Sequence, residues 1–208
     1  KPMACRNAHL ADWLRRMASP HALLAACKQQ QRQMDAAALE KIMKEADEEL
    51  GEKLDQLGEK IIFMKKGQRV FRKPDGTLRI VLDHLPIHNL SAIEGRWISE
   101  LSINGSSISD LRGLPAGSLK VLVASNIRRN SSTKAMDLEL LRGTSLESLT
   151  FDGTWVTDIS ALKDLPLTLL SLRNTQVSDL TPLTGCASLE NLDLSSTPVT
   201  DVTAWVTR

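Results

Sequence analysis

The sequence repeats itself near its C-terminal end. Two stretches, 167–183 and 189–205, carry the same kinds of residue at the same positions, 22 residues apart. The matched pairs are Leu167 and Leu189, Leu170 and Leu192, Leu172 and Leu194, Thr175 and Thr197, Val177 and Val199, Asp179 and Asp201, Leu180 and Val202, and Leu183 and Trp205. A short fixed period predicts a solenoid, in which neighbouring repeats together bury one continuous core.

Four more units precede these two, at steps of about 21 residues. The six units begin near residues 77, 98, 119, 146, 167 and 189. Each reads LxxLxL, then polar residues, a β-branched or small apolar residue, and an Asp or Asn followed by two more apolar positions. The LxxLxL segment predicts a short strand with its leucines inward and the alternate residues outward.

The six units resemble the leucine-rich repeat, in the short bacterial form seen in internalin-like proteins and in the repeats attached to some planctomycete-type receptor kinases. The resemblance covers roughly residues 77–205 and implies an α/β fold, a leucine-rich repeat solenoid with a parallel β-sheet on its concave face. One position departs from the family pattern, because the usual turn asparagine is replaced by Ser106, Thr154, Thr175 and Thr197. We expect these hydroxyls to bond local backbone at the turn.

The N-terminal third predicts a second domain, a helical N-terminal cap or helical bundle at 1–66, before the solenoid at 67–208. Apolar spacing predicts helices at about 8–17 and 20–33 and a longer one from Asp35. The apolar positions of the long helix are Leu39, Met43, Ala46, Leu50, Leu54, Leu57, Ile61 and Met64. This near-heptad pattern leaves two interpretations open. The helix packs on its two predecessors and on the first repeat, or it forms a homodimer through Leu39–Met64.

We favour packing within the chain, because fewer than four clean heptads are present. The dense charges of the long helix are then expected to form a solvated face. They are Glu45, Asp47, Glu48, Glu49, Glu52 and Lys53.

A β-hairpin is expected between the long helix and the repeats. The apolar runs Val70–Phe71 and Leu78–Leu82 flank the turn sequence Lys73-Pro74-Asp75-Gly76. The second strand is also the first repeat strand, so the first strand should pair antiparallel onto the edge of the parallel sheet. The hairpin and the helices would then cover an edge that otherwise invites aggregation.

The third unit is longer than the others, with 27 residues from Leu119 to Leu146. The extra residues lie within Ser125–Lys134 and are basic at Arg128, Arg129 and Lys134. In the next unit Trp155 occupies a position that should face solvent and that holds Ser107, Gln176, Pro198 and Pro86 elsewhere. Insertions in repeat proteins often lie on the binding side, and Trp and Arg are typical of interface hot spots.

The predicted partner-binding residues are therefore the insertion with Trp155, together with two residues of the concave face. They are Arg128, Arg129, Lys134, Trp155, Asp152 and Arg173. An alternative stays open, in which the loop folds over Trp155 and shields it by Arg–Trp stacking. The outward positions of the six repeat strands carry mixed charges, short side chains and no aromatic residue.

The sequence carries no recognisable catalytic, nucleotide-binding or metal-binding motif, so we expect no enzyme and no cofactor. His84 and His88 lie four residues apart, but in the first repeat's turn rather than on a helix, so they do not form a zinc-peptidase motif. The column of Asn89, Asp110, Asp137, Asp158, Asp179 and Asp201 is expected to bond turn backbone rather than a metal. Cys186 is expected to be a small buried filler, and pairing of Cys5 with Cys27 is left open.

Charge and hydropathy narrow the class of partner. The net charge of +1 gives no overall attraction to nucleic acid, and no run of 18 apolar residues predicts a membrane span. We therefore expect a non-catalytic protein-protein interaction module, with a cytoplasmic location slightly favoured over secretion. The alternatives are a structural or assembly protein that oligomerises through its N-terminal helices, or the repeat segment of a larger signalling enzyme such as a bacterial kinase.

Overall fold

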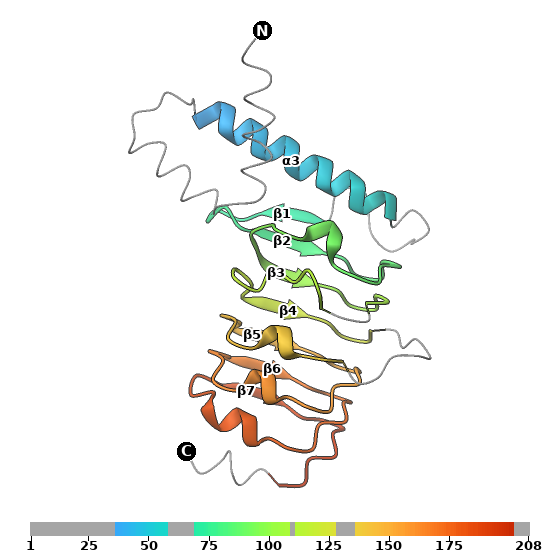
Figure 1. Ribbon diagram of the computed structural model, residues 1–208, viewed down its shortest axis with the longest axis vertical. Helices are drawn as coiled ribbons and strands as arrows, with labels where there is room; N and C mark the ends of the chain where they lie inside the picture. Colours follow the sequence, from blue (N-terminus) through green and yellow to red (C-terminus); the bar gives the residue numbers. More distant parts are fainter. Residues whose placement is uncertain (1–35, 58–68, 109–110, 128–135, 202–208) are drawn as a thin grey trace.

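The computed structural model describes residues 36–57, 69–108, 111–127 and 136–201 of the 208-residue chain. Within these ranges, one α-helix is followed by seven strands, with 3₁₀ helices between them (Figure 1). The elements are α3 (Ala36–Leu57), β1 (Val70–Arg72), β2 (Leu78–Val81), η1 (Ser91–Ile93), β3 (Ile98–Ser102), β4 (Val121–Val123), η2 (Glu139–Leu141), β5 (Ser148–Thr150), η3 (Ser160–Leu162), β6 (Leu169–Ser171), η4 (Thr181–Gly185) and β7 (Asn191–Asp193).

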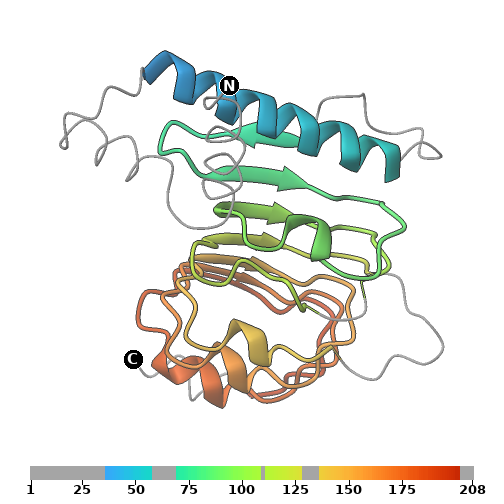
Figure 2. The same ribbon diagram turned by 45° about the horizontal axis from the view of Figure 1, so that its top comes forward.

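The strands form a single sheet in chain order from β1 to β7. Strand β1 is antiparallel to β2, and every later pair is parallel. The hairpin and the solenoid with its parallel sheet are therefore as the sequence predicts. Each coil returns by a 3₁₀ helix or loop on the side away from the sheet, and α3 lies across the β1 end (Figures 1 and 2).

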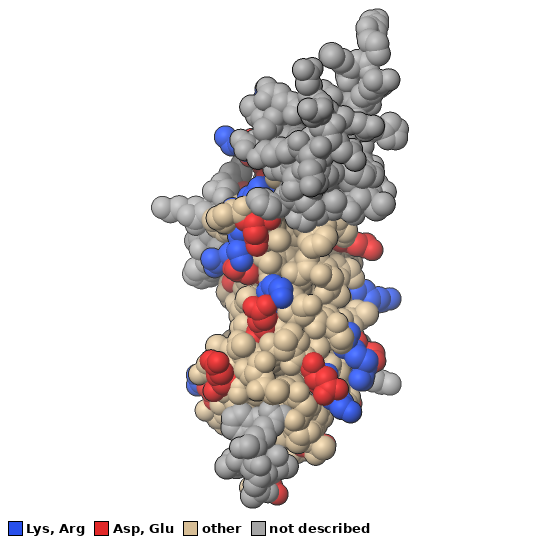
Figure 3. Space-filling view, turned by 90° about the vertical axis from the view of Figure 1, so that its left-hand side faces the viewer, with Lys and Arg blue, Asp and Glu red and all other residues tan. Residues whose placement is uncertain are grey.

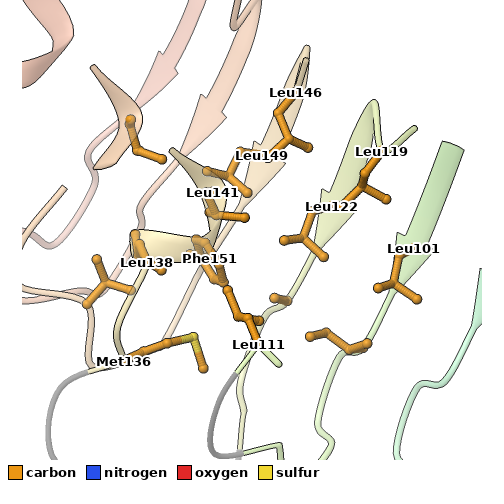
Figure 4. Packing of buried hydrophobic residues seen from close by; sticks show 14 of the residues in the cluster. Leu101, Leu111, Leu119, Leu122, Met136, Leu138, Leu141, Leu146, Leu149 and Phe151 are labelled. Carbon is orange, nitrogen blue, oxygen red and sulfur yellow. The ribbon is translucent and has the colours of Figure 1, made fainter. Parts of the chain in front are cut away.

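The core runs the length of the sheet as stacked rows of leucines. The central inward row pairs Ile80, Leu101, Leu122, Leu149, Leu170 and Leu192 from strand to strand. Leu101, Leu122 and Leu149 project inward from neighbouring strands, and Leu111 and Leu141 approach from the return side (Figure 4). Leu122, Leu149 and Phe151 are completely buried, as expected for a solenoid core shared by adjacent coils.

Each coil turns away from the sheet through one residue with left-handed backbone. The six residues are His84, Gly105, Asn126, Gly153, Asn174 and Ser196, with φ between 52° and 64°. A Cβ at Gly105 would lie 2.3 Å from Nδ1 of His84, and one at Gly153 would lie 2.6 Å from Oδ1 of Asn126. Four residues other than glycine adopt this φ in the equivalent coils, so at Gly105 and Gly153 the closeness of the preceding coil's side chain is the stronger reason for glycine.

Four members of the acidic column form turns, as predicted, and a fifth, Asp110, lies outside the described residues. The Oδ1 atoms of Asn89, Asp137, Asp158 and Asp179 each accept the backbone N–H two residues on, at 2.8 to 3.0 Å. That N–H belongs in each case to the first residue of the following 3₁₀ helix. These side chains therefore fix the direction of the return segment, which is the ordinary role of an Asx turn.

Four hydroxyl residues replace the usual turn asparagine, and all four were predicted to bond local backbone. Three of them do so. Thr154, Thr175 and Thr197 donate to the carbonyls of Phe151, Leu172 and Leu194, at 2.6 to 2.8 Å. Ser106 differs, since its Oγ is buried without a hydrogen-bond partner within the described ranges. Each threonine bonds inside its own coil, so these side chains stiffen the turn without linking neighbouring coils.

Helix α3 packs against the hairpin through two leucines and two ion pairs. Leu50 and Leu54 are buried in the same core cluster as the repeats. Arg72 binds Asp47 in a bidentate manner, with Nε to Oδ2 at 2.7 Å and N–H of Nη2 to Oδ1 at 2.8 Å. Nε of Arg69 lies 3.2 Å from Oδ1 of Asp55, and both side chains are almost fully buried.

The prediction that Asp47 belongs to a solvated face is wrong, because its side chain is only 15% exposed and fixes α3 to β1. Glu45, Glu48, Glu49, Glu52 and Lys53 are exposed as expected.

The long helix is confirmed to Leu57. Its predicted continuation to Met64 lies outside the described residues, as do both predicted helices before it and the Cys5–Cys27 pair. The homodimer and the boundary at residue 66 remain predictions.

Cys186 is a buried filler, as predicted. Its side chain is completely buried, and its Sγ lies 3.2 Å from the carbonyl oxygen of Leu162 in the preceding coil. It therefore occupies interior space at the join between two coils.

Candidate partner-binding surface

The outward face of the sheet is built from three rows of side chains. The first is Arg79, Glu100, Val121, Ser148, Leu169 and Asn191, and the second is Val81, Ser102, Val123, Thr150, Ser171 and Asp193. The third follows the strand ends at Asp83, Asn104, Ser125, Asp152, Arg173 and Ser195. The strand register confirms the outward positions expected from the alternation of residues. We call this surface the sheet face.

The sheet face carries an aromatic residue that the sequence analysis missed. Phe71 of β1 pairs with Arg79 of β2, so both side chains lie on the same side of the sheet. The Phe71 ring is 43% exposed, and the Arg79 guanidinium lies 5.8 Å from its centroid. The expected hairpin could have revealed Phe71. A hairpin strand added to the sheet extends each outward row by one residue, and Phe71 is the residue opposite Arg79.

Charged residues gather beside Phe71. The Glu100 carboxylate contacts Nζ of Lys73 at 2.7 Å and lies 3.7 Å from Nε of Arg79. Arg79 is 59% exposed. This end of the sheet face therefore offers an aromatic ring, two cations and one carboxylate on neighbouring strands.

Two of the predicted binding residues, Asp152 and Arg173, lie next to each other near the other end of the face. Oδ1 of Asp152 accepts the Ser171 hydroxyl at 2.5 Å and the backbone N–H of Arg173 at 3.1 Å. Asp152 thus helps to hold the next coil, while the Arg173 side chain is 60% exposed, with its Nε 3.6 Å from Asp193. Arg173 is consequently the more available of the two for a partner.

Trp155 is placed differently from its expected exposed position. The same position is exposed at Pro86, Gln176 and Pro198, whereas Trp155 is half-buried and packs against the core cluster. The basic residues Arg128, Arg129 and Lys134 lie outside the described residues. The grouping of Trp155 with this insertion therefore remains a prediction.

On the part of the molecule coloured in Figure 3, charges of both signs are interspersed rather than gathered in one patch of one sign. Figure 3 shows acidic and basic side chains lying beside one another, with broad uncharged surface between them. Apolar groups contribute to the sheet face at Phe71 and Leu169, of which Leu169 is 38% exposed.

The carboxyl groups with shifted pKa are all turn or ion-pair acceptors. The hydroxyl and N–H of Ser195 lower the pKa of Asp193, and the corresponding groups of Thr181 lower that of Asp179. The Arg142 guanidinium lowers the pKa of Glu139. A general acid needs a raised pKa, and these environments stabilise the charged form instead. Within the described ranges, no three His, Cys, Asp or Glu side chains are grouped to hold a metal ion.

These features define a solenoid of leucine-rich coils closed at one end by a helix and a hairpin. A family model described as "Leucine Rich repeats (2 copies)" matches residues 167–206, which are the two units that repeat most regularly. The same rows continue through the four coils before them. Residues 167–206 are therefore similar to leucine-rich repeats.

One solved structure similar to this chain is the crystal structure of internalin C2 from Listeria monocytogenes. It is 26% identical, covers 62% of this chain and 66% of that chain, and has a TM-score of 0.44. The chain thus spans slightly less than two thirds of that internalin. A search of curated proteins finds no match. No helix within the described residues is both long and apolar enough to cross a membrane.

Proposed function

We propose that this chain is a non-catalytic protein-binding module and that the sheet face binds the partner, assisted by the basic insertion of the third repeat. The supporting observation is the open sheet face. The exposed Phe71 lies at its β1 end and the exposed Leu169 on β6, and Arg79 and Arg173 also lie on it. Aromatic and arginine side chains are the residues that most often dominate binding energy at protein interfaces.

The short side chains between these groups support the same proposal. The middle of the sheet face carries the short side chains of Ser102, Thr150 and Ser171, which do not project far from the strands. Their hydroxyls add polar groups to the face. A rigid scaffold with little side-chain entropy to lose is well suited to binding a folded or extended protein segment.

The test compares two exposed leucines on opposite sides of the coil. Leu169→Glu alters the sheet face, and Leu140→Glu alters η2 on the return side, where Leu140 is 47% exposed. Proteins retained by the immobilised wild-type chain should still be retained by the Leu140 variant and be lost by the Leu169 variant. Equal retention by both variants would rule out the sheet face as the binding surface.

The contribution of the insertion is tested separately. Arg128→Ala together with Arg129→Ala should weaken retention of the same proteins without lowering the melting temperature. Trp155→Ala is a poorer probe, because loss of its packing against the core is expected to destabilise the coil. Unchanged retention by the double arginine variant would leave the sheet face as the whole binding surface.

A further inference from the structure

We propose that a groove beside α3 holds the N-terminal segment of the same chain, residues 1–34. The groove has a volume of about 750 Å³ and lies along α3 beside Val70 of β1. Its described lining consists of Lys44, Asp47, Glu48, Gly51, Glu52, Asp55, Gln56 and Val70. None of these residues belongs to the sheet face, so the groove is a second and separate surface.

The floor of the groove includes Gly51 of α3 and Val70 of β1. Gly51 lies in the interior of α3, where glycine is unfavourable relative to alanine. It is buried, yet no heavy atom of the described residues lies within 4 Å of the place that a Cβ would take. Val70 beside it is only partly buried. An apolar side chain of the occupant would pack on Gly51 and Val70, the two described lining residues that lack a polar side chain.

The rim of the groove is acidic. Glu48 and Glu52 are exposed and lie one helical turn apart on α3. Nζ of Lys44 is 3.8 Å from Glu48, but both of these side chains are more than 60% exposed, so the pair is weak. Asp47 and Asp55 are bound to Arg72 and Arg69. The two glutamates are therefore the acidic groups available to an occupant.

The N-terminal segment has the complementary chemistry. Residues 1–34 contain six Lys or Arg and one Asp, whereas α3 contains seven Asp or Glu and three Lys. The apolar residues Leu10, Trp13, Leu14 and Met17 recur at the spacing of one helical face, and Arg15 and Arg16 lie between them. Apolar side chains suit the floor of the groove, and the two guanidinium groups suit its rim.

The occupant is taken to be this segment rather than a second molecule because it is covalently joined to α3. Residue 34 lies two positions before the first residue of the helix. Such a linkage gives the segment a high effective concentration at the groove, at any protein concentration. A basic segment from another protein would have to displace it.

The experiment places a photoreactive benzophenone side chain at Gln56, on the rim of the groove, in the full chain. The matched control places it at Glu45, which is also exposed on α3 but does not line the groove. After illumination, mass spectrometry should find the Gln56 probe joined to peptides from residues 1–34 of the same molecule, and the Glu45 probe joined to them far less often. Arg15→Glu together with Arg16→Glu should lower the cross-linking yield roughly tenfold, the effect of losing two modest ion pairs.

Other outcomes overturn the proposal. Cross-links between two chains would show that a second copy occupies the groove. Cross-links to residues 58–68 would assign the groove to the connection between α3 and β1. Equal yields from Gln56 and Glu45, or no cross-link from Gln56, would show that the segment does not lie there. A yield unaffected by charge reversal would contradict the role given to the acidic rim.

Discussion

The repeated coils and the α3 end of the solenoid are held together in different ways. In the coils, contacts of the same kind recur: an inward leucine or isoleucine on each parallel strand, an Asx acceptor before each 3₁₀ helix and, in three coils, a threonine hydroxyl bonded within the turn. At the α3 end each contact occurs once, namely the two buried leucines and the two ion pairs to the hairpin. The loss of one contact therefore leaves equivalent contacts in the other coils, whereas at the α3 end it removes a contact that no repeat replaces.

The largest effect is expected from a cavity in the middle of the solenoid. Leu149→Ala removes a completely buried side chain that adjacent coils share, which should lower the free energy of unfolding by about 2–5 kcal/mol. Leu192→Ala in the last described strand is the control, since Leu192 is only partly buried. Urea denaturation measures both. Equal losses would show that packing is not concentrated in the middle coils.

The second largest effect is expected at the ion pair that joins α3 to β1. Arg72→Ala removes a bidentate, largely buried pair with Asp47 and should cost about 2 kcal/mol, because the carboxylate keeps its burial but loses its partner. Lys44→Ala breaks only the exposed pair with Glu48 and should change stability by less than about 0.5 kcal/mol. If thermal unfolding of the Arg72 variant matches that of the Lys44 variant, the ion pair does not hold α3 in place.

The third effect compares two turn hydroxyls in equivalent positions. Thr175→Val removes the bond to the Leu172 carbonyl and should cost about 1 kcal/mol. Ser106→Ala should be neutral or slightly stabilising, because that hydroxyl is buried with no partner in the described part of the chain. The reverse order of stabilities, measured by chemical denaturation, would contradict the role assigned to the turn threonines.

The smallest effect is a pH dependence of the Asx turns. Bonds from Thr181 lower the pKa of Asp179 below its ordinary value of 3.8, so the folded state binds the proton less readily than the unfolded state. The stabilisation is therefore present above that value and is lost as the pH falls through the lower, folded-state pKa. The difference in urea midpoint between wild type and Asp179→Ala should be larger at pH 7 than at pH 3. A difference that is independent of pH would show that the charged carboxylate is not needed.

The repeated part of the fold was predictable because its signals recur in the sequence. Six copies of the LxxLxL segment define the register, and the period places Asp158 and Asp179 at equivalent positions in the turns of successive coils. The α3 contacts could not be found this way, since Asp47 and Arg72 are 25 residues apart and belong to no repeat. An exposed acidic helix and one that binds an arginine have the same sequence pattern.

On the sheet face, too, the residues within the repeats could be placed from the sequence, and the residue outside them could not. Alternation placed Asp152 and Arg173 correctly at the ends of neighbouring strands. It missed Phe71, because β1 precedes the first repeat and enters the sheet only through the hairpin. Trp155 was placed by its position in the repeat, but position does not show how far a large ring turns back onto the core.

Helix α3 acts as a cap, because it buries Leu50 and Leu54 within its own chain. Light scattering of the full chain at micromolar concentration measures its mass in solution directly. Because Leu50 and Leu54 are already buried against the hairpin and the first coils, the chain should be a monomer with the mass of one copy, 22.9 kDa. A stable particle of twice that mass, reduced to one copy when Glu48 and Glu52 are replaced by Arg, would contradict the account and make α3 the site of dimerisation.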